Sequence, residues 1–299
     1  MDPRRRALLA LLAVGAAAVR PSLAQNRIMT KQIPSTREPL PVIGVGTWQT
    51  FDVGADNAAR AQLRDVLKLL KGNVVDSSPM YGSSESVAGD LIAGLGTREQ
   101  LFMATKVWTR GRAEGIAQME TSFKRLRVER MDLMQIHNLV DVETHTKTLL
   151  EMKSRKKIRY LGITHYTSSA YAEVERWLKT RQYDFLQINY SLGERESERR
   201  ILPLAKELNV AVIVNRPFAE GALFRKTKSI PLPSWAAELG IGSWAQYFLK
   251  WIVSHPAVTC AIPGTGNPKH MADNLGAGRG PLPDAAARKR MAEHFDSSS

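Results

Sequence analysis

The sequence has a single cysteine, Cys260, among its 299 residues, and aromatic residues make up only 7% of the chain. One cysteine excludes an intramolecular disulfide and any metal site built from several cysteines. The histidines and carboxylates show no metal-ligand spacing, so we expect no metal. The chain contains no low-complexity tract, and 43% of its residues are hydrophobic. This composition is typical of a globular protein with one large α/β domain or two small ones.

Acidic residues are outnumbered by basic ones, which gives a formal net charge of +13. The cations are spread along segments of helical periodicity, such as Lys124–Arg127, Arg155–Lys157 and Arg288–Arg290. No aromatic residues are interleaved with them. This distribution is typical of solvated helix faces, so we expect a small-molecule partner and no nucleic acid.

The N-terminus has the features of a targeting segment. Arg4, Arg5 and Arg6 precede the apolar run Ala7–Val19, and the small residues of Ser22-Leu23-Ala24 follow. This pattern predicts a signal peptide over residues 1–24 and a folded domain over residues 25–299. The run is too short to span a bilayer, so no stable membrane anchor is expected after cleavage. Consecutive arginines before an Ala-rich run resemble a twin-arginine signal, which implies a periplasmic or secreted protein.

The rest of the chain alternates between apolar runs and segments of helical periodicity. Strands are predicted at Ile43–Thr47, Asn73–Asp76, Leu101–Lys106, Met131–His137, Tyr160–Thr164, Phe185–Asn189, Val210–Asn215 and Val258–Pro263. Helices are predicted at Ala55–Lys71, Ser84–Leu95, Arg112–Leu126, Val142–Lys153, Ser168–Thr180, Glu196–Leu208, Ser243–Val253, Pro268–Leu275 and Asp284–Phe295. Eight such units predict an α/β fold, a (β/α)₈ TIM barrel. A short β-hairpin, Arg27–Ile33 with Pro39–Ile43, precedes the barrel and the last helix follows it.

A dinucleotide-binding Rossmann domain is the main alternative fold. Gly44-Val45-Gly46 has no third glycine three residues later, and no predicted helix begins there. The glycines at 264–266 and 276–280 are not followed by a βαβ pattern with a downstream acid. The sequence therefore disfavours that fold.

Four side chains of catalytic type stand at or just after the carboxyl ends of three consecutive predicted strands. They are Asp76 with Tyr81 on the loop that follows it, Lys106, and His137. In a barrel all the carboxyl ends meet at one face, so these groups should lie together. An ammonium beside a phenol lowers the phenol's pKa, and a carboxylate keeps that ammonium charged. Such a set can protonate a carbonyl oxygen, with His137 positioning the substrate.

In this order and at these strand ends, Asp76, Tyr81, Lys106 and His137 resemble the catalytic tetrad of the aldo-keto reductase family. The resemblance extends to Gly44-Val45-Gly46-Thr47-Trp48 in the first strand. It implies NADPH as the cofactor, with NADH as the alternative. It also implies that Thr164, His165 and Gln187 hold the nicotinamide carboxamide, and that Pro263, Thr265, Lys269, Asp273 and Asn274 belong to the segment that takes the adenosine phosphate and adenine.

Two departures from the family pattern change what is expected. Asn215-Arg216-Pro217 stands where many members have an aromatic residue, Ser and Pro, so Arg216 is expected to contact the cofactor diphosphate or ribose instead of an aromatic ring stacking on the nicotinamide. Gly264 and His270 stand where many members have a basic pair for the 2′-phosphate, which leaves Lys269 as the nearby cation. Trp48 and Trp108 are expected as walls of the substrate pocket.

The sequence thus predicts an NAD(P)H-dependent enzyme that reduces an aldehyde or ketone by hydride transfer, with Tyr81 as the general acid. The alternative from another functional class is a cofactor-binding regulatory or accessory protein of the same fold with little turnover. A third interpretation, an isomerase or lyase, predicts no NAD(P)H binding. The particular substrate and the oligomeric state do not follow from the sequence.

Overall fold

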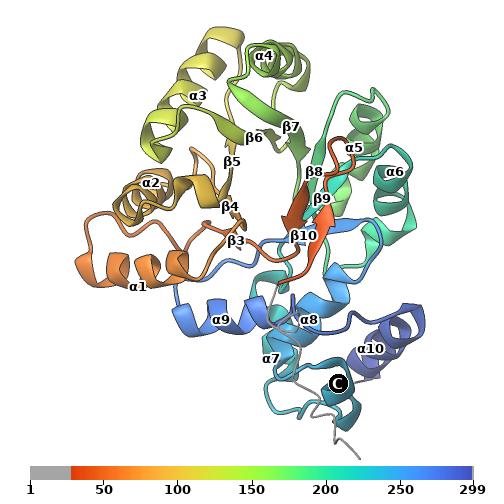
Figure 1. Cartoon of the computed structure of the whole chain (residues 1–299). Helices are drawn as coiled ribbons and strands as arrows, with labels where there is room; N and C mark the ends of the chain where they lie inside the picture. The colour runs from red at the N-terminus through yellow and green to blue at the C-terminus, as the bar shows by residue number, and fades with distance from the viewer. Residues whose placement is uncertain (1–27, 298–299) are drawn as a thin grey trace, which may run out of the picture.

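The computed structural model of the chain describes residues 28–297. The predicted signal peptide, residues 1–24, lies outside the described residues. The described part is a parallel eight-stranded barrel surrounded by helices, as Figure 1 shows. This confirms the predicted (β/α)₈ fold and excludes the Rossmann alternative.

The eight barrel strands follow one another in chain order around the sheet, from β3 to β10. Their bounds are β3 Val45–Gly46, β4 Val74–Asp76, β5 Phe102–Val107, β6 Met131–His137, β7 Ile158–Thr164, β8 Phe185–Asn189, β9 Ala211–Asn215 and β10 Val258–Ala261. Parallel bridges between Ile43 and Ala261 and between Gly46 and Gly264 join the first strand to the last. The sheet is therefore closed, and no edge strand is left unpaired.

A two-stranded hairpin covers the amino-terminal end of the barrel. Its strands, β1 Thr30–Gln32 and β2 Pro39–Pro41, are antiparallel, as predicted. Ile33 and Leu40 are fully or almost fully buried and belong to the same apolar cluster as the inward side chains of the barrel strands. The hairpin therefore excludes water from this end.

Helices form the outer layer. They are α1 Asn57–Lys68, α2 Ser84–Leu95, α3 Arg112–Leu126, α4 Val142–Ser154, α5 Tyr171–Leu178, α6 Ile201–Glu207, α7 Ala222–Thr227, α8 Trp244–Val253, α9 Pro268–Gly276 and α10 Ala285–Ser297. The sequence pattern predicts the bounds of α2 and α3 and misses α7, which is too short to show a helical period. No helix in residues 28–297 is long and apolar enough to cross a bilayer.

The side chains that point into the barrel change from apolar to polar along the central strands β5 and β6. On β5, Phe102 and Ala104 belong to the inner apolar cluster, and Lys106 follows two residues later. On β6, Leu133 belongs to the same cluster, and Gln135 and His137 follow at the same spacing. Residues two apart on a strand face the same side. The lower part of the barrel is therefore an apolar core, and the polar side chains gather at the carboxyl ends.

The outer helices α2 and α3 pack closely at Gly89, and substitutions in α2 can test this contact. A methyl group added at Gly89 in α2 would overlap the backbone of α3 at the Arg125 carbonyl and, at 2.8 Å, the Leu126 Cα. Gly94, in the same helix, has no atom within 4 Å of such a methyl group. We therefore expect Gly89→Ala to lower the free energy of unfolding by about 1–3 kcal/mol, whereas Gly94→Ala should raise it by about 0.5–1 kcal/mol. Denaturant unfolding of both variants measures the difference, and equal effects would contradict the packing described.

Candidate active site

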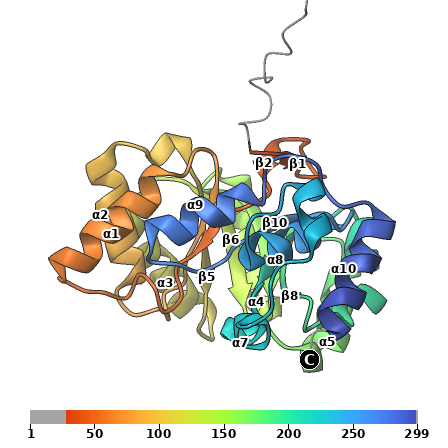
Figure 2. The ribbon, with the colours of Figure 1, turned by 90° about the horizontal axis from the view of Figure 1, so that it is seen from below.

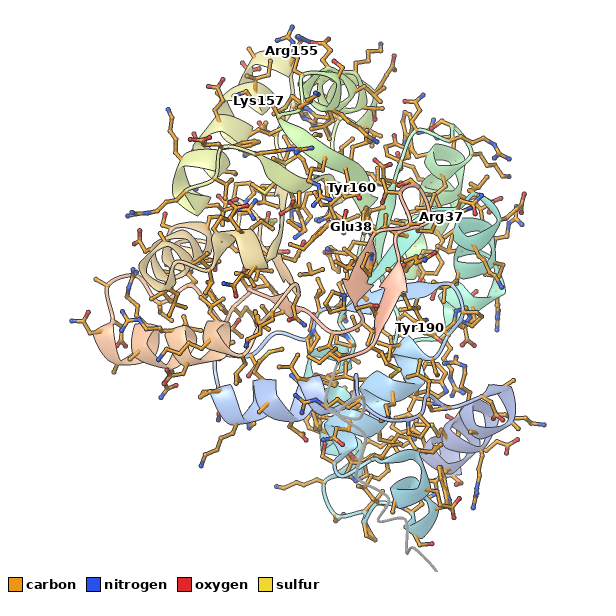
Figure 3. The ribbon with its side chains drawn as sticks, viewed as in Figure 1. Arg37, Glu38, Arg155, Lys157, Tyr160 and Tyr190 are labelled. Atoms are coloured by element: carbon orange, nitrogen blue, oxygen red, sulfur yellow. The ribbon has the colours of Figure 1, made fainter. Side chains whose placement is uncertain are left out.

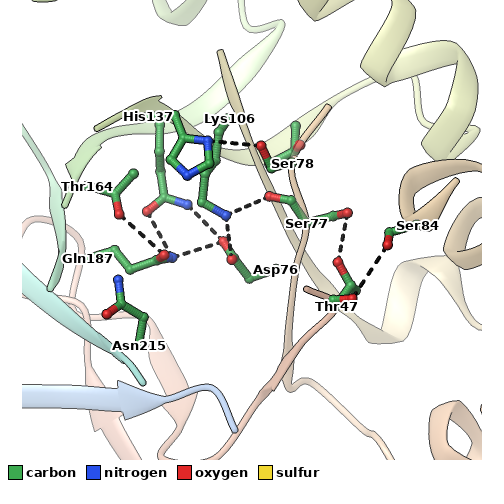
Figure 4. Close-up of polar contacts among 12 residues, drawn as sticks. Thr47, Asp76, Ser77, Ser78, Ser84, Lys106, His137, Thr164, Gln187 and Asn215 are labelled. Carbon is green, nitrogen blue, oxygen red and sulfur yellow. Dashed lines mark hydrogen bonds and ion pairs between the residues drawn. The ribbon is translucent and has the colours of Figure 1, made fainter. Parts of the chain in front are cut away.

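A buried ion pair lies at the carboxyl end of the barrel. The Lys106 Nζ atom donates to Asp76 Oδ2 at 2.6 Å and to the Ser77 carbonyl at 2.7 Å. The exposed fractions of the two side chains are 0% and 4%. The other oxygen of Asp76, Oδ1, accepts from the side-chain amides of Gln135 at 2.9 Å and Gln187 at 3.0 Å, as Figure 4 shows. Both charges are therefore hydrogen-bonded although water does not reach them.

Lys106 remains charged in this setting. Burial by itself lowers the pKa of an ammonium, but the Asp76 carboxylate and the neighbouring Tyr81 outweigh it, and the pKa of Lys106 lies above its ordinary value. The Asp76 carboxylate therefore favours the protonated form of Lys106.

Tyr81 lies next to this ammonium. The Lys106 Nζ atom is 5.0 Å from the centre of the Tyr81 ring. Burial raises the pKa of the Tyr81 phenol, and the opposing effect of Lys106 does not cancel it, so the pKa lies above its ordinary value. The expectation of a lowered phenol pKa was wrong. Burial destabilises the phenolate more than the nearby Lys106 ammonium stabilises it. Tyr81 therefore keeps its proton throughout the neutral range.

His137 completes the group. Its ring packs edge-on against the Tyr81 ring, with 5.8 Å between centres. The Nδ1 atom is 3.0 Å from the Ser78 hydroxyl, which leaves Nε2 for a ligand. Burial, helped by the charge of Lys106, lowers the pKa of His137 to about 2. The imidazole is therefore neutral near pH 7 and can form a hydrogen bond with a substrate oxygen without adding charge.

A cavity of about 690 Å³ opens above these side chains. Its walls bring together many of the residues that the sequence predicts for the site: Trp48, Asp76, Tyr81, His137, Thr164, Gln187, Asn215 and Arg216. Lys106 is completely buried and lies beneath the residues that line the cavity. The predicted catalytic groups are thus placed together at the base of one cavity.

The wall formed by β7, β8 and β9 fits a carboxamide. Thr164 Oγ1 donates to Gln187 Oε1 at 3.3 Å, and Asn215 Nδ2 donates to the His165 carbonyl at 3.0 Å. The Asn215 Oδ1 atom is buried and has no hydrogen-bond partner among the described residues. An unsatisfied buried acceptor on a cavity wall is unfavourable unless a ligand donates to it. The amide group of a nicotinamide can make that donation, so these residues fit the predicted cofactor.

Arg216 lies on the same wall, and its interactions are incomplete. Its guanidinium is 3.4 Å from a carboxylate oxygen of Glu194 and 3.5 Å from one of Glu220. Both distances exceed those of strong charge-assisted hydrogen bonds. Its Nε atom is buried without a partner in the described part of the chain. Arg216 can therefore donate hydrogen bonds to a further anionic or carbonyl ligand.

The other residues predicted to contact the cofactor lie outside this cavity lining. His165 is half-buried and stacks on Tyr166, with 5.5 Å between ring centres. Pro263 and Thr265 are buried, and Lys269 is exposed in the first turn of α9. Asn274 is buried in α9. Both carboxylate oxygens of Asp273 are engaged, with Ser243 Oγ and Gln246 Nε2, each at 2.7 Å. His165 was predicted to contact the nicotinamide, and the other five residues belong to the adenosine half of the predicted cofactor site.

Both tryptophans predicted as pocket walls are exposed, but only Trp48 lines the cavity. Trp48 is 45% exposed and lines the cavity, and Trp108 is 42% exposed with its ring centre 6.5 Å from that of His137. Met80, Tyr166 and Phe224 also line the cavity and are exposed. No sequence pattern assigned these last three residues to the pocket, because they lie on loops or a short helix whose paths depend on the fold.

Two polar residues of the site were missed from the sequence. Gln135 binds Asp76, and Ser78 contacts His137. A signal for Gln135 was present, because it precedes His137 by two residues on one strand and must therefore point into the barrel with it. Ser78 follows Asp76 by two residues on a loop, where no such alternation applies.

Comparison with known proteins places this fold and site in a family. The family model described as "Aldo/keto reductase family" matches residues 42–291. The chain belongs to the aldo/keto reductase family. As a member it is an NAD(P)-dependent oxidoreductase that reduces carbonyl groups, which agrees with the function predicted from the sequence.

Several individual proteins are similar to this aldo/keto reductase. Methylglyoxal reductase YeaE of Escherichia coli is 29% identical over 247 residues, which cover 79% of this chain and 84% of the relative. Aldo-keto reductase str7 of Strobilurus tenacellus is 27% identical over 262 residues, covering 74% and 77%. An aldo-keto reductase structure from Klebsiella pneumoniae, in complex with NADPH, superposes with a TM-score of 0.75 at 24% identity, covering 90% of this chain and 95% of that chain. At that identity the superposition supports the barrel fold alone.

The neutrality of His137 predicts how the stability of this reductase depends on pH. In the unfolded chain a histidine takes up a proton below its ordinary pKa of about 6.5, whereas folded His137 does not until about pH 2. The unfolded state thus binds more protons, and stability decreases as the pH falls. We expect His137 to account for a loss of about 2 kcal/mol in the free energy of unfolding between about pH 7 and pH 5.

Denaturant unfolding of the wild type and of His137→Gln at several pH values measures the contribution of His137 to this loss of stability. The variant should show a correspondingly smaller loss over the same range, whatever its absolute stability. Equal losses in the two proteins would show that His137 titrates normally in the folded state.

Proposed function

We propose that this aldo/keto reductase uses NADPH to reduce an aldehyde or ketone, with Tyr81 as the proton donor. The observation that carries the proposal is the group formed by Tyr81, His137 and the buried Lys106–Asp76 ion pair at the base of the cavity. NADPH, when bound, supplies a hydride to the carbonyl carbon. The chain must then bind the substrate oxygen, hold it, and give it a proton.

The properties of the four residues suit these tasks. The raised pKa of Tyr81 keeps its proton available at neutral pH. Once the proton has moved to the substrate oxygen, the phenolate that remains is stabilised by Lys106, whose positive charge Asp76 maintains. Neutral His137 can hold the substrate oxygen through Nε2, because Nδ1 already faces Ser78. The single proton of this scheme comes from Tyr81, and the raised pKa of that phenol supports the assignment.

The cofactor would be held along the β7–β9 wall and the start of α9. Thr164, Gln187 and Asn215 offer an acceptor and hydroxyl or amide groups for the nicotinamide carboxamide. Arg216 offers an under-used guanidinium for the diphosphate or ribose. Lys269 is an exposed cation beside the amino end of α9, where a 2′-phosphate would be favoured over a hydroxyl. NADPH bound to the Klebsiella pneumoniae structure supports this choice.

The substrate is a small carbonyl compound that enters between apolar walls. Trp48 and Met80 line the cavity near Tyr81, and Trp108 lies beyond His137. The name of the Escherichia coli relative makes methylglyoxal the first compound to assay.

Removal of the Tyr81 hydroxyl tests the proposal. We expect Tyr81→Phe to lower kcat for carbonyl reduction by about 10²–10⁴-fold, because the proton donor is lost. The dissociation constant for NADPH, measured by fluorescence, should change little. Tyr166→Phe is the matched control, since Tyr166 lines the same cavity and its ring stacks on His165, and it should keep a near wild-type rate.

Two outcomes would contradict this assignment. Wild-type turnover by Tyr81→Phe would exclude Tyr81 as the proton donor. Tight NADPH binding by the wild type, with no reduction of any carbonyl compound, would instead favour the cofactor-binding accessory protein.

We also propose that the protein is exported with residues 1–24 as a twin-arginine-type signal peptide. The arginines at positions 4–6, the apolar run Ala7–Val19 and the small residues before Gln25 support this. A twin-arginine route carries folded proteins, so the barrel would leave the cytoplasm with its cofactor bound.

The mature N-terminus and any bound nucleotide test the export proposal together. Mass spectrometry of protein purified from the native compartment should find an N-terminus at Gln25 and a bound NADP. Replacing Arg4, Arg5 and Arg6 by lysine should leave uncleaved precursor in the cytoplasm. A wild-type protein that retains Met1 would contradict cleavage, and mature protein without nucleotide would contradict loading before export.

A further inference from the structure

The amino-terminal end of the barrel, opposite the active site, carries an excess of exposed positive charge. Seven cations lie on the hairpin turn and on the turns that lead from helices into strands; we call this set the basic face. They are Arg37, Lys71, Arg130, Arg155, Lys156, Lys157 and Arg181. All seven are exposed, and none forms an ion pair with another residue of the described chain.

The carboxylates on the same turns do not neutralise this charge. Glu38 pairs with Arg159, and Asp184 pairs with Lys153 at 2.6 Å. Only Glu99 and Glu129 are exposed there without an ion pair among the described residues. The turns therefore carry several more free cations than free carboxylates, and the excess is confined to one end of the molecule.

The basic face includes the hairpin turn and the turn between α4 and β7. Figure 3 shows Arg37 on the hairpin, and Arg155 and Lys157 on the turn between α4 and β7, on the side of the barrel that faces the viewer. Helix dipoles favour a cation at each helix carboxyl end. That preference does not account for three consecutive cations at Arg155–Lys157, nor for Arg37, which is in a hairpin and follows no helix.

In the precursor, before the proposed cleavage, the same chain also carries a basic and apolar segment. The described chain begins at Ile28, two residues before β1 of the hairpin. The three arginines at positions 4–6 and the apolar run Ala7–Val19 precede it. Only residues 20–27 separate the run from Ile28, and eight residues reach at most about 29 Å. An apolar segment and a basic surface are thus tethered to each other within the same chain.

We propose that the basic face docks the folded protein on an anionic phospholipid surface, with the active-site cavity facing away from the bilayer. Lysines and arginines near an anionic membrane each add to its attraction for a protein. One short apolar segment gives only weak attachment, whereas such a segment combined with a basic surface gives stable attachment. This orientation leaves the cavity open to substrate.

Sedimentation of the full chain with vesicles tests the proposal. One set of vesicles contains phosphatidylcholine alone, and the other contains phosphatidylcholine with phosphatidylglycerol. The test variant is Arg155→Glu with Lys157→Glu. The control is Arg225→Glu with Lys228→Glu, which changes the net charge equally. Arg225 and Lys228 are exposed on and just after α7, which Figure 2 places at the end of the barrel opposite the hairpin.

We expect the wild type and the control to bind the anionic vesicles more tightly than the neutral ones, and added salt to reduce this difference. The Arg155→Glu, Lys157→Glu variant should bind the anionic vesicles at least about tenfold more weakly than the control. Its thermal unfolding should match that of the wild type, which shows that the fold is kept. The apolar run is common to all three proteins and cannot produce the difference.

Equal binding of the test variant and the control would overturn the proposal. So would equal binding of the wild type to neutral and anionic vesicles. Binding of a polynucleotide without vesicle binding, lost in the test variant, would assign the basic face to nucleic acid instead.

Discussion

The ion pair between Lys106 and Asp76 is the interaction on which the rest of the site depends. Two charges shielded from water are costly unless each is paired and hydrogen-bonded. Asp76 accepts from Lys106 and from the amides of Gln135 and Gln187, while Lys106 also donates to the Ser77 carbonyl. These partners come from four different strands or the loops that follow them. Closure of the barrel is therefore a condition for keeping the pair charged.

The same burial acts in opposite directions on the two groups above the pair. It raises the pKa of Tyr81, because the phenolate is the charged form of a phenol. It lowers the pKa of His137, because the imidazolium is the charged form of an imidazole. Both groups are consequently neutral near pH 7, and the only charges at the base of the cavity are those of the ion pair. This state suits the roles proposed for Tyr81 as proton donor and for His137 as a positioning group.

The inward side chains of the barrel are apolar at one end and polar at the other. Apolar residues from the lower part of the strands, together with Ile33 and Leu40 of the hairpin, fill the amino-terminal half. Polar side chains occupy inward positions at or near the carboxyl ends of six successive strands: Asp76, Lys106, His137, Thr164, Gln187 and Asn215. The apolar half supplies the burial that shifts the pKa values of the polar half. The turns at the amino-terminal end of the barrel do not contact the polar side chains of the site. The positive charge of these turns can therefore take part in a different interaction.

The sequence by itself determined the barrel and the four groups at its mouth. Apolar runs separated by helical periods are a local property, and a strand ending in Asp, Lys or His can be recognised without knowing its neighbours. The sense of the Tyr81 pKa shift needed the tertiary structure, because it depends on how completely the surrounding strands exclude water. The structure was also needed to show the buried Asn215 oxygen without a hydrogen-bond partner, the glutamates around Arg216, and the contacts of Gln135 and Ser78. Each of these depends on residues from separate elements meeting within a few ångströms, and no pattern along one stretch of chain encodes that distance.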